Sequence, residues 1–207
     1  ITLLDTTRKA MVRLLNNRLA KIMVKHQILK GNQFAGLPGT TFESLHILNA
    51  LMEDAKYKNQ EIWILFQVLL KAYDRVNVQM LRKAMERLKL PFAFIDLIEN
   101  VFSERKNQVF TEVGLTNPYE MLVGIDQGEV MSPLLWCIYY DPLLCEIQHH
   151  ELGYNLEHHY KQNIYSEHEE LLSACVGDLA FMDDTTLVSS SLQGLVNMLN
   201  TANEFYL

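Results

Sequence analysis

The sequence predicts an α+β fold in which a sheet packs on helices. Helix-like and strand-like segments alternate in its second half around a short hairpin, which is typical of that class. The composition agrees, because 49% of the residues are hydrophobic and 21% are charged, as in ordinary globular proteins. A length of 207 residues suits one large domain or two small ones.

Helical spacing of apolar residues predicts six helices. The first is expected at residues 7–26, with an apolar face made of Met11, Leu14, Leu15, Leu19 and Ile22. Ser132-Pro133 supplies an N-cap and a first-turn proline for a helix that is expected to run to about residue 149. The other helices are expected at residues 41–57, 78–88 and 92–102, and from residue 190 onward.

The segments between these helices predict the strands. Residues 62–66 are rich in aromatic and β-branched side chains, which suits a buried strand. Residues 107–123 are expected to form a hairpin that turns at Asn117-Pro118. Residues 171–181 and 185–189 are expected to form two strands joined by an Asp-Asp turn, whereas residues 151–170 lack a pattern and are expected to form a surface excursion.

Charge is unevenly distributed along the chain. The net charge is −7, but residues 1–30 carry a net charge of +6 and residues 117–207 one of −13. A basic arm beside an acidic body suits a metal-dependent polymerase, in which cations face template phosphates and carboxylates hold metal ions. A solvated helix face is the alternative explanation for the basic residues.

Nothing in the sequence predicts a membrane-bound or secreted protein. The apolar run at residues 130–140 is too short to cross a bilayer, and residues 1–15 carry charges where a secretory signal would be apolar. Cys137, Cys145 and Cys175 are too widely spaced for a disulfide framework, so we expect buried thiols in a reducing compartment. The expected location is intracellular, either nuclear or cytoplasmic.

Asp183 and Asp184 are adjacent carboxylates at the tip of a predicted hairpin. By themselves they are typical of a tight turn, in which Asp is favoured. A catalytic role for these two aspartates is indicated only by other segments, which occur with them in a fixed order along the chain.

Three segments resemble motifs A, B and C of the reverse transcriptase palm. They are Lys71-Ala72-Tyr73-Asp74 after an aromatic strand, Gly124-Ile125-Asp126-Gln127-Gly128 leading into Ser132-Pro133-Leu134, and Phe181-Met182-Asp183-Asp184. Upstream, Ile1-Thr2-Leu3-Leu4 with Arg8-Lys9, and the segment from Asn32 to Thr41, resemble the fingers of the same enzymes. The chain thus resembles the reverse transcriptase (RNA-directed DNA polymerase) domain of a non-long-terminal-repeat retrotransposon.

This resemblance implies reverse-transcriptase-like fingers at residues 1–60 and a palm with an antiparallel sheet at residues 61–207, with the thumb outside this sequence. The implied reaction is nucleotidyl transfer assisted by two Mg²⁺ or Mn²⁺ ions, since carboxylate oxygens suit such hard cations. The implied partners are an RNA template, a DNA primer and deoxynucleoside triphosphates, and no membrane.

The implied metal ligands are Asp183, Asp184 and an aspartate of motif A. The motif A position falls four residues before Ala72, where this sequence has Val68. A valine cannot bind a metal, and Asp74 is rejected as a substitute because that alignment would displace the Ala-aromatic pair. We therefore predict an impaired polymerase, with a catalytically dead, nucleic-acid-binding remnant as the alternative. A palm-type cyclase that needs no template is a further alternative, against which the motif B match argues.

The resemblance also implies substrate-binding residues. Tyr73 matches the aromatic that packs under the sugar and excludes a 2′-hydroxyl, with a core aromatic as the alternative. Gln127 and Gly128 match the loop that positions template and nucleotide, with a turn before a helix as the alternative. Arg8 and Lys9 are expected to face phosphates unless they belong to a solvated helix face.

Two acidic residues depart from the family pattern in motif B. Asp126 and Glu129 stand where proline and serine are usual. They are expected to add negative charge where a triphosphate approaches.

Five histidines lie close together in the sequence, at positions 149, 150, 158, 159 and 168. Imidazole is a common zinc ligand, but no cysteine lies near them at zinc-finger spacing. We interpret these histidines as part of a variable surface loop.

Overall fold

The structure is a computed structural model that describes residues 4–35, 39–160 and 170–206. The chain forms two compact units, one of Ile1–Leu29 with Leu70–Tyr140 and the other of Lys30–Leu69 with Asp141–Leu207. Each unit draws on both halves of the sequence. None of the helices in the described residues is long and apolar enough to cross a membrane.

All six predicted helices are confirmed, with ends that differ by about two residues at most. Their bounds, with one short 3-10 helix η1, are α1 Thr6–His26, α2 Thr41–Lys58, η1 Tyr73–Arg75, α3 Val78–Arg87, α4 Phe92–Phe102, α5 Ser132–His149 and α6 Leu192–Tyr206.

α1 buries only part of the predicted face, since Leu19 is buried as expected and Leu15 is half-buried. Val12, Leu19 and Met23 are its buried residues, whereas Leu14 and Ile22 are more than half exposed. Apolar residues occur on more than one side of this helix, so their spacing was compatible with more than one buried face. Packing within its unit selects the face that contains Val12 and Met23.

The described strands form one three-stranded and three two-stranded sheets, all with antiparallel pairing in their ladders. The strand orders are β1-β9-β8, β2-β5, β3-β4 and β6-β7. Their bounds are β1 Trp63–Val68, β2 Arg105–Asn107, β3 Phe110–Thr111, β4 Gly114–Leu115, β5 Tyr119–Met121, β6 Tyr154–Tyr160, β7 Glu170–Val176, β8 Asp178–Phe181 and β9 Asp184–Ser189.

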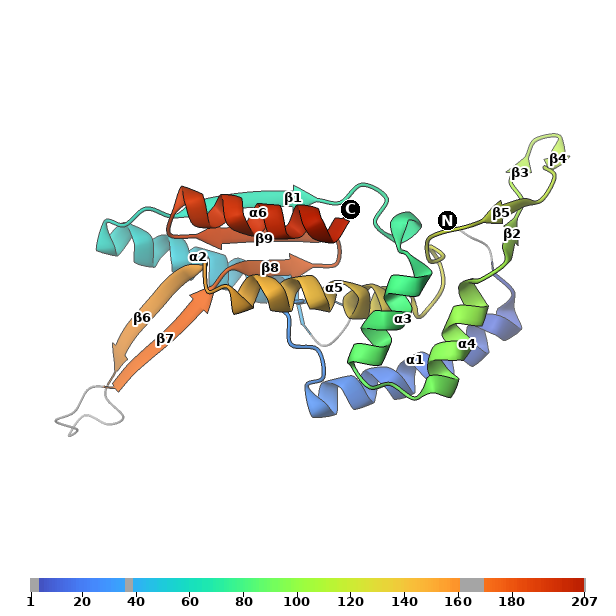
Figure 1. Cartoon of the computed structure of the whole chain (residues 1–207), viewed down its shortest axis with the longest axis horizontal. Coiled ribbons are helices and arrows are strands. Elements are labelled where there is room, and N and C mark those ends of the chain that lie inside the picture. Colours follow the sequence, from blue (N-terminus) through green and yellow to red (C-terminus); the bar gives the residue numbers. More distant parts are fainter. Residues whose placement is uncertain (1–3, 36–38, 161–169, 207) are drawn as a thin grey trace. The chain divides into compact units, whose positions relative to one another are not determined.

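The β1-β9-β8 sheet is covered by helices on both sides (Figure 1). Val188 of β9 belongs to a buried cluster with Leu51 and Ala55 of α2. Neighbouring strand residues face opposite sides, so the buried Leu187 faces away from α2. α6 contacts β9 and β1, and Figure 1 shows it lying along these two strands. The predicted antiparallel sheet packed on helices is confirmed.

The hairpin expected at residues 107–123 forms, but it turns elsewhere. β2 pairs with β5, and inside them β3 pairs with β4 through Thr111 and Gly114. The tip therefore lies between these two residues, and the predicted turn at Asn117-Pro118 is wrong. Gly114 adopts a φ of 119°, a conformation that glycine tolerates and that suits a tight turn.

The strand expected at residues 171–181 is divided at Gly177, which corrects the prediction of one strand. β7 pairs with β6 and β8 pairs with β9, so the two parts belong to different sheets. A Cβ atom at Gly153 would lie 2.5 Å from the Val176 carbonyl oxygen, so two backbone segments meet here in a space that only glycine fits. Residues 154–160 form β6, so this part of the expected surface excursion is a strand; residues 161–169 lie outside the described part.

Candidate active site

The turn between β8 and β9 carries the two candidate metal ligands. Phe181 and Asp184 form the closing pair of the hairpin, which leaves Met182 and Asp183 as its two turn residues. Met182 has a φ of 56°, in the left-handed region that two-residue hairpin turns use. Asp184 is exposed and Asp183 is partly exposed, so both carboxylates are accessible to a dissolved ion.

Gln33 holds this turn through its side chain. Its Oε1 accepts a hydrogen bond from the Met182 N–H at 2.8 Å, and its Nε2 donates to the Met182 carbonyl at 3.1 Å. A parallel bridge between Gln33 and Ala180 brings the segment of residues 32–34 alongside β8. The Gln33 side chain therefore holds the backbone of the turn that carries Asp183 and Asp184.

Replacing Gln33 by alanine is expected to loosen the turn. The Gln33→Ala change removes both hydrogen bonds to Met182, with an expected loss of about 1–2 kcal/mol in the free energy of unfolding. Faster hydrogen exchange at the Met182 amide would report the effect locally. The matched control is Gln193→Ala, which removes one exposed contact to Asn197 on α6. Unchanged Met182 exchange in Gln33→Ala would contradict this role.

The register of the sheet places Val68 directly opposite Asp184. Cα atoms of directly opposed residues in an antiparallel ladder lie about 4.5–5.5 Å apart, and their side chains share one face of the sheet. Val68 is 74% exposed. The structure thus brings the side chains of these two residues together, while Asp74 belongs to η1 beyond the end of β1.

In the other unit, η1 and the loop before α5 are bound to each other. The N–H of Ile125 donates to the Tyr73 carbonyl and the N–H of Gly124 to the Val76 carbonyl, both at 2.8 Å. Gly124 has a φ of 92°, and a Cβ atom there would lie 2.8 Å from the Asp74 carbonyl oxygen. Only glycine suits this approach.

Tyr73 is half-buried, and its ring meets Trp136 edge to face with 5.9 Å between the ring centroids. Gln127 and Gly128 are both exposed in the turn before α5, where Gly128 has a φ of 113°. The packing of Tyr73 fits its interpretation as a core aromatic. The exposure of Gln127 and Gly128 fits their interpretation as a loop that meets template and nucleotide.

Ion pairs of two buried carboxylates support this loop on both sides of Gln127 and Gly128. Asp126 accepts from the Arg105 guanidinium at 2.6 Å and from that of Arg8 at 3.3 Å, and Glu129 accepts from Arg8 Nε at 3.0 Å. Asp126 and Glu129 are 4% and 3% exposed. The expectation that they present negative charge to a triphosphate is wrong, because their side chains are buried and paired with guanidinium groups.

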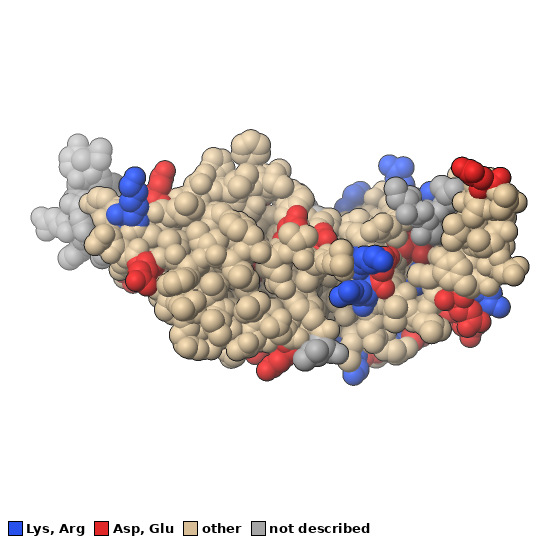
Figure 2. Space-filling view, turned by 90° about the horizontal axis from the view of Figure 1, so that it is seen from above, with Lys and Arg blue, Asp and Glu red and all other residues tan. Residues whose placement is uncertain are grey.

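The ion pairs of Arg8 also concern the expectation that Arg8 and Lys9 of α1 face phosphates. The Arg8 guanidinium contacts Asp126 and Glu129, so in this structure it faces carboxylates. Lys9 is half-buried and makes no ion pair with a described residue. On the face shown in Figure 2, Lys and Arg side chains form separate patches with Asp and Glu side chains among them.

Asp178, at the start of β8, is a buried acid that the sequence did not single out. It is 0% exposed, and neither carboxylate oxygen has a well-formed hydrogen bond within the described residues. Burial raises the pKa of Asp178 to about 7, and the nearby Gln148 side chain opposes that rise only in part. It pairs with Leu187 on the strand ladder, on the face of the sheet away from Asp184.

The raised pKa predicts that Asp178 destabilises the fold at neutral and alkaline pH. The unfolded pKa is near 3.8 and the folded one about 7, so stability falls as the pH rises between these values. The Asp178→Asn variant mimics the protonated form. Its gain in unfolding free energy over the unchanged chain should be larger at pH 8 than at pH 5 by about 2 kcal/mol.

Urea denaturation at both pH values measures this difference. The control is Glu53→Gln on the exposed face of α2, which should give the same stability change at pH 5 and pH 8. A pH-independent effect of Asp178→Asn would show that the carboxyl is not destabilised in the folded state.

Comparison with known proteins decides the family. Residues 1–206 match the family described as reverse transcriptase (RNA-dependent DNA polymerase). The chain belongs to the reverse transcriptase family. The prediction from motifs A, B and C is thereby confirmed, although Ile1 to Leu3 and residues 36–38 of the resembling segments lie outside the described part.

Curated relatives of this reverse transcriptase domain carry transposon names. It is 27% identical over 207 residues to a probable RNA-directed DNA polymerase from transposon BS of Drosophila melanogaster, covering 97% of this chain and 21% of that protein. It is 25% identical over 149 residues to a Pol polyprotein from the type-1 retrotransposable element R2 of Popillia japonica, covering 72% and 20%. The domain thus spans about a fifth of these relatives.

Solved structures agree on the fold of the reverse transcriptase domain. Telomerase from Candida albicans, in complex with a fragment of telomeric RNA, aligns with a TM-score of 0.60 at 12% identity over 93% of this chain and 32% of that one. Apo telomerase from Candida tropicalis gives 0.59 at 14% identity over 96% and 34%. The predicted reverse-transcriptase-like α+β class is confirmed.

Sequence reasoning gave no role to three residues of the reverse transcriptase domain, namely Gln33, Arg105 and Asp178. Gln33 lies in a segment that resembles the fingers, but its partner Met182 is 149 residues away. Arg105 pairs with Asp126, 21 residues away, so no local pattern predicts either contact. Asp178 could have been noticed as a lone acid in an otherwise apolar strand, a position where a carboxyl is buried.

Proposed function

We propose that this chain is the fingers and palm of an RNA-directed DNA polymerase from a non-long-terminal-repeat retroelement, with nucleotidyl transfer impaired by Val68. The observation that carries the proposal is the cross-strand pairing of Val68 with Asp184. This is where the family resemblance implies a third carboxylate. The proposed fingers are residues 1–60 and the proposed palm is residues 61–207.

Asp183 and Asp184 would hold the divalent ions of such a polymerase. Their carboxylate oxygens are donors that Mg²⁺ and Mn²⁺ prefer, so the donors fit in kind. However, Asp183 and Asp184 supply only two of the three carboxylates that the resemblance implies, because the isopropyl group of Val68 has no lone pair to bind a metal ion. When bound, a pair of such ions stabilises charge on the attacking and leaving oxygens of phosphoryl transfer.

The proposed partners are an RNA template, a DNA primer and deoxynucleoside triphosphates. Tyr73 would contact the sugar, Gln127 and Gly128 the template and nucleotide, and Lys9 a phosphate. The exposure of the Gln127-Gly128 turn supports this assignment. For Arg8 we propose a positioning role, since its guanidinium is engaged by Asp126 and Glu129.

The alternative function is a remnant that binds nucleic acid without catalysis, which the loss of a carboxylate at Val68 also favours. Binding and extension of a DNA primer on an RNA template with Mg²⁺ test both proposals in the full-length protein and its Val68→Asp variant. Extension by the variant alone supports the impaired polymerase. Binding without extension in both proteins supports the remnant, and loss of both activities in both proteins rejects either function.

A further inference from the structure

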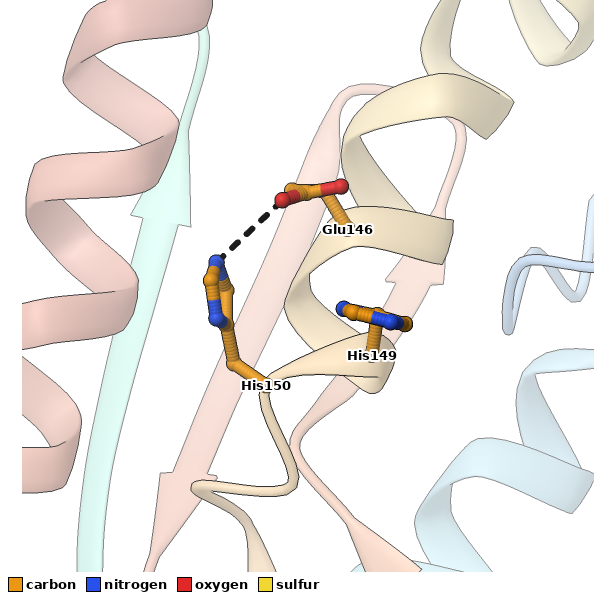
Figure 3. A group of neighbouring side chains, drawn as sticks. All are labelled: Glu146, His149 and His150. Atoms are coloured by element: carbon orange, nitrogen blue, oxygen red, sulfur yellow. Dashed lines mark ion pairs between the residues drawn. The ribbon is translucent and has the colours of Figure 1, made fainter.

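The end of α5 gathers three metal-binding side chains at a place separate from the proposed active-site turn. Glu146, His149 and His150 each offer one ligand atom, and these atoms lie within 4.8 Å of one another. Figure 3 shows Glu146 and His150 pointing toward each other, with His149 beside them. The interpretation of His149 and His150 as residues of a surface loop is corrected, because His149 is the last residue of α5 and His150 directly follows it.

Helical spacing explains why the three side chains meet. Residues three and four positions apart lie on the same face of a helix, so both histidines are neighbours of Glu146. The N–H of His150 donates to the Glu146 carbonyl at 3.3 Å, which keeps the last turn closed. Glu151 follows with a φ of 51°, so the helix ends directly after the cluster.

Two of the three side chains already lie at a distance that suits ligands of one metal ion. His150 Nε2 lies 3.3 Å from Glu146 Oε1, close to the roughly 3.4 Å that separates two ligands of a tetrahedral zinc ion. All three residues are exposed, so their side chains have room to change rotamer, and the His149 ligand nitrogen lies within 4.8 Å of the other two ligand atoms. The carbonyl end of a helix also favours a nearby cation.

We propose that Glu146, His149 and His150 form a surface site for a divalent transition-metal ion, with zinc as the best-suited ion. Two imidazoles with one carboxylate match the ligands that zinc prefers and suit Mg²⁺ poorly. Three protein ligands leave the fourth tetrahedral position to water. Bound zinc would fix the last turn of α5, after which the chain continues into β6. The site does not depend on the proposed polymerase function.

Titration calorimetry with zinc chloride tests the site in the 207-residue chain. Binding is expected to persist in millimolar Mg²⁺, because imidazole discriminates against that ion. His149→Ala, His150→Ala and Glu146→Gln should each weaken zinc at least about tenfold, since even the loss of a residue that only supports a ligand costs that much. Cobalt(II) should give the intense visible absorption of a tetrahedral complex, and His150→Ala should abolish it.

Matched variants separate this site from other zinc ligands in the chain. His26→Ala removes an exposed histidine from the last turn of α1 and should leave zinc binding unchanged. Glu53→Gln on the exposed face of α2 should also leave it unchanged, because the proposed site does not use that carboxylate. The proposal is overturned if zinc does not bind, if the affinity survives His149→Ala and His150→Ala, or if it is lost only on replacing His158 and His159.

Discussion

The Val68→Asp variant of the full-length protein is expected to extend an RNA-templated primer at least about 100-fold faster than the unchanged sequence, since misplacement of reacting groups by about 1 Å costs that much. A carboxylate at position 68 would project from the same face of the sheet as Asp184. Three acidic side chains would then converge at this end of the sheet, as two-ion phosphoryl transfer requires.

Two controls define what the added carboxylate must do. Phe66→Asp places the same charge on the same face of β1, at a side chain that is 72% exposed, but two residue pairs away from the pair of Val68 with Asp184. Val68→Asn has the shape of aspartate without its charge. Both should remain near the background rate. Strong synthesis by the unchanged sequence would show that the ligand assignment at Val68 is wrong.

The Arg105→Met variant is expected to lower the free energy of unfolding by about 3 kcal/mol or more, because it leaves a buried carboxylate with too few partners. Arg105 is 8% exposed, and its guanidinium donates to Asp126 and to the carbonyls of Phe102, Val123 and Gly124. Methionine keeps much of the side-chain volume but none of these hydrogen bonds. Urea denaturation measures the loss.

The neighbouring residue supplies the control for Arg105. Lys106→Met makes a similar cation-to-methionine change at an exposed side chain of β2 and should cost less than about 0.5 kcal/mol. Adding Asp126→Asn to Arg105→Met should restore part of the stability, since the unpaired charge is then removed. A small loss in Arg105→Met, with no recovery in the double variant, would show that the ion pair does not support the loop.

The sequence by itself determined the helices, the family and the places of the two adjacent aspartates. The helices and the aspartate pair depend on residues that are close in the chain, and the family depends on several short motifs in a fixed order. Apolar spacing encodes α2, α3 and α4, and the adjacency of Asp183 and Asp184 is a property of the sequence alone. Short sequence patterns of this kind determine local backbone structure, so they predict it before the structure is known.

Only the tertiary structure decided which charges are buried and what they contact. From the sequence, Asp126 and Glu129 were expected to repel a substrate, but Arg8, more than a hundred residues earlier, pairs with both. Three other features were also decided by the tertiary structure alone. They are the hydrogen bonds between Gln33 and Met182, the buried carboxyl of Asp178 and the buried face of α1. Burial and pairing depend on partners that the fold brings together from distant parts of the chain, and a carboxylate's charge and pKa follow from those partners.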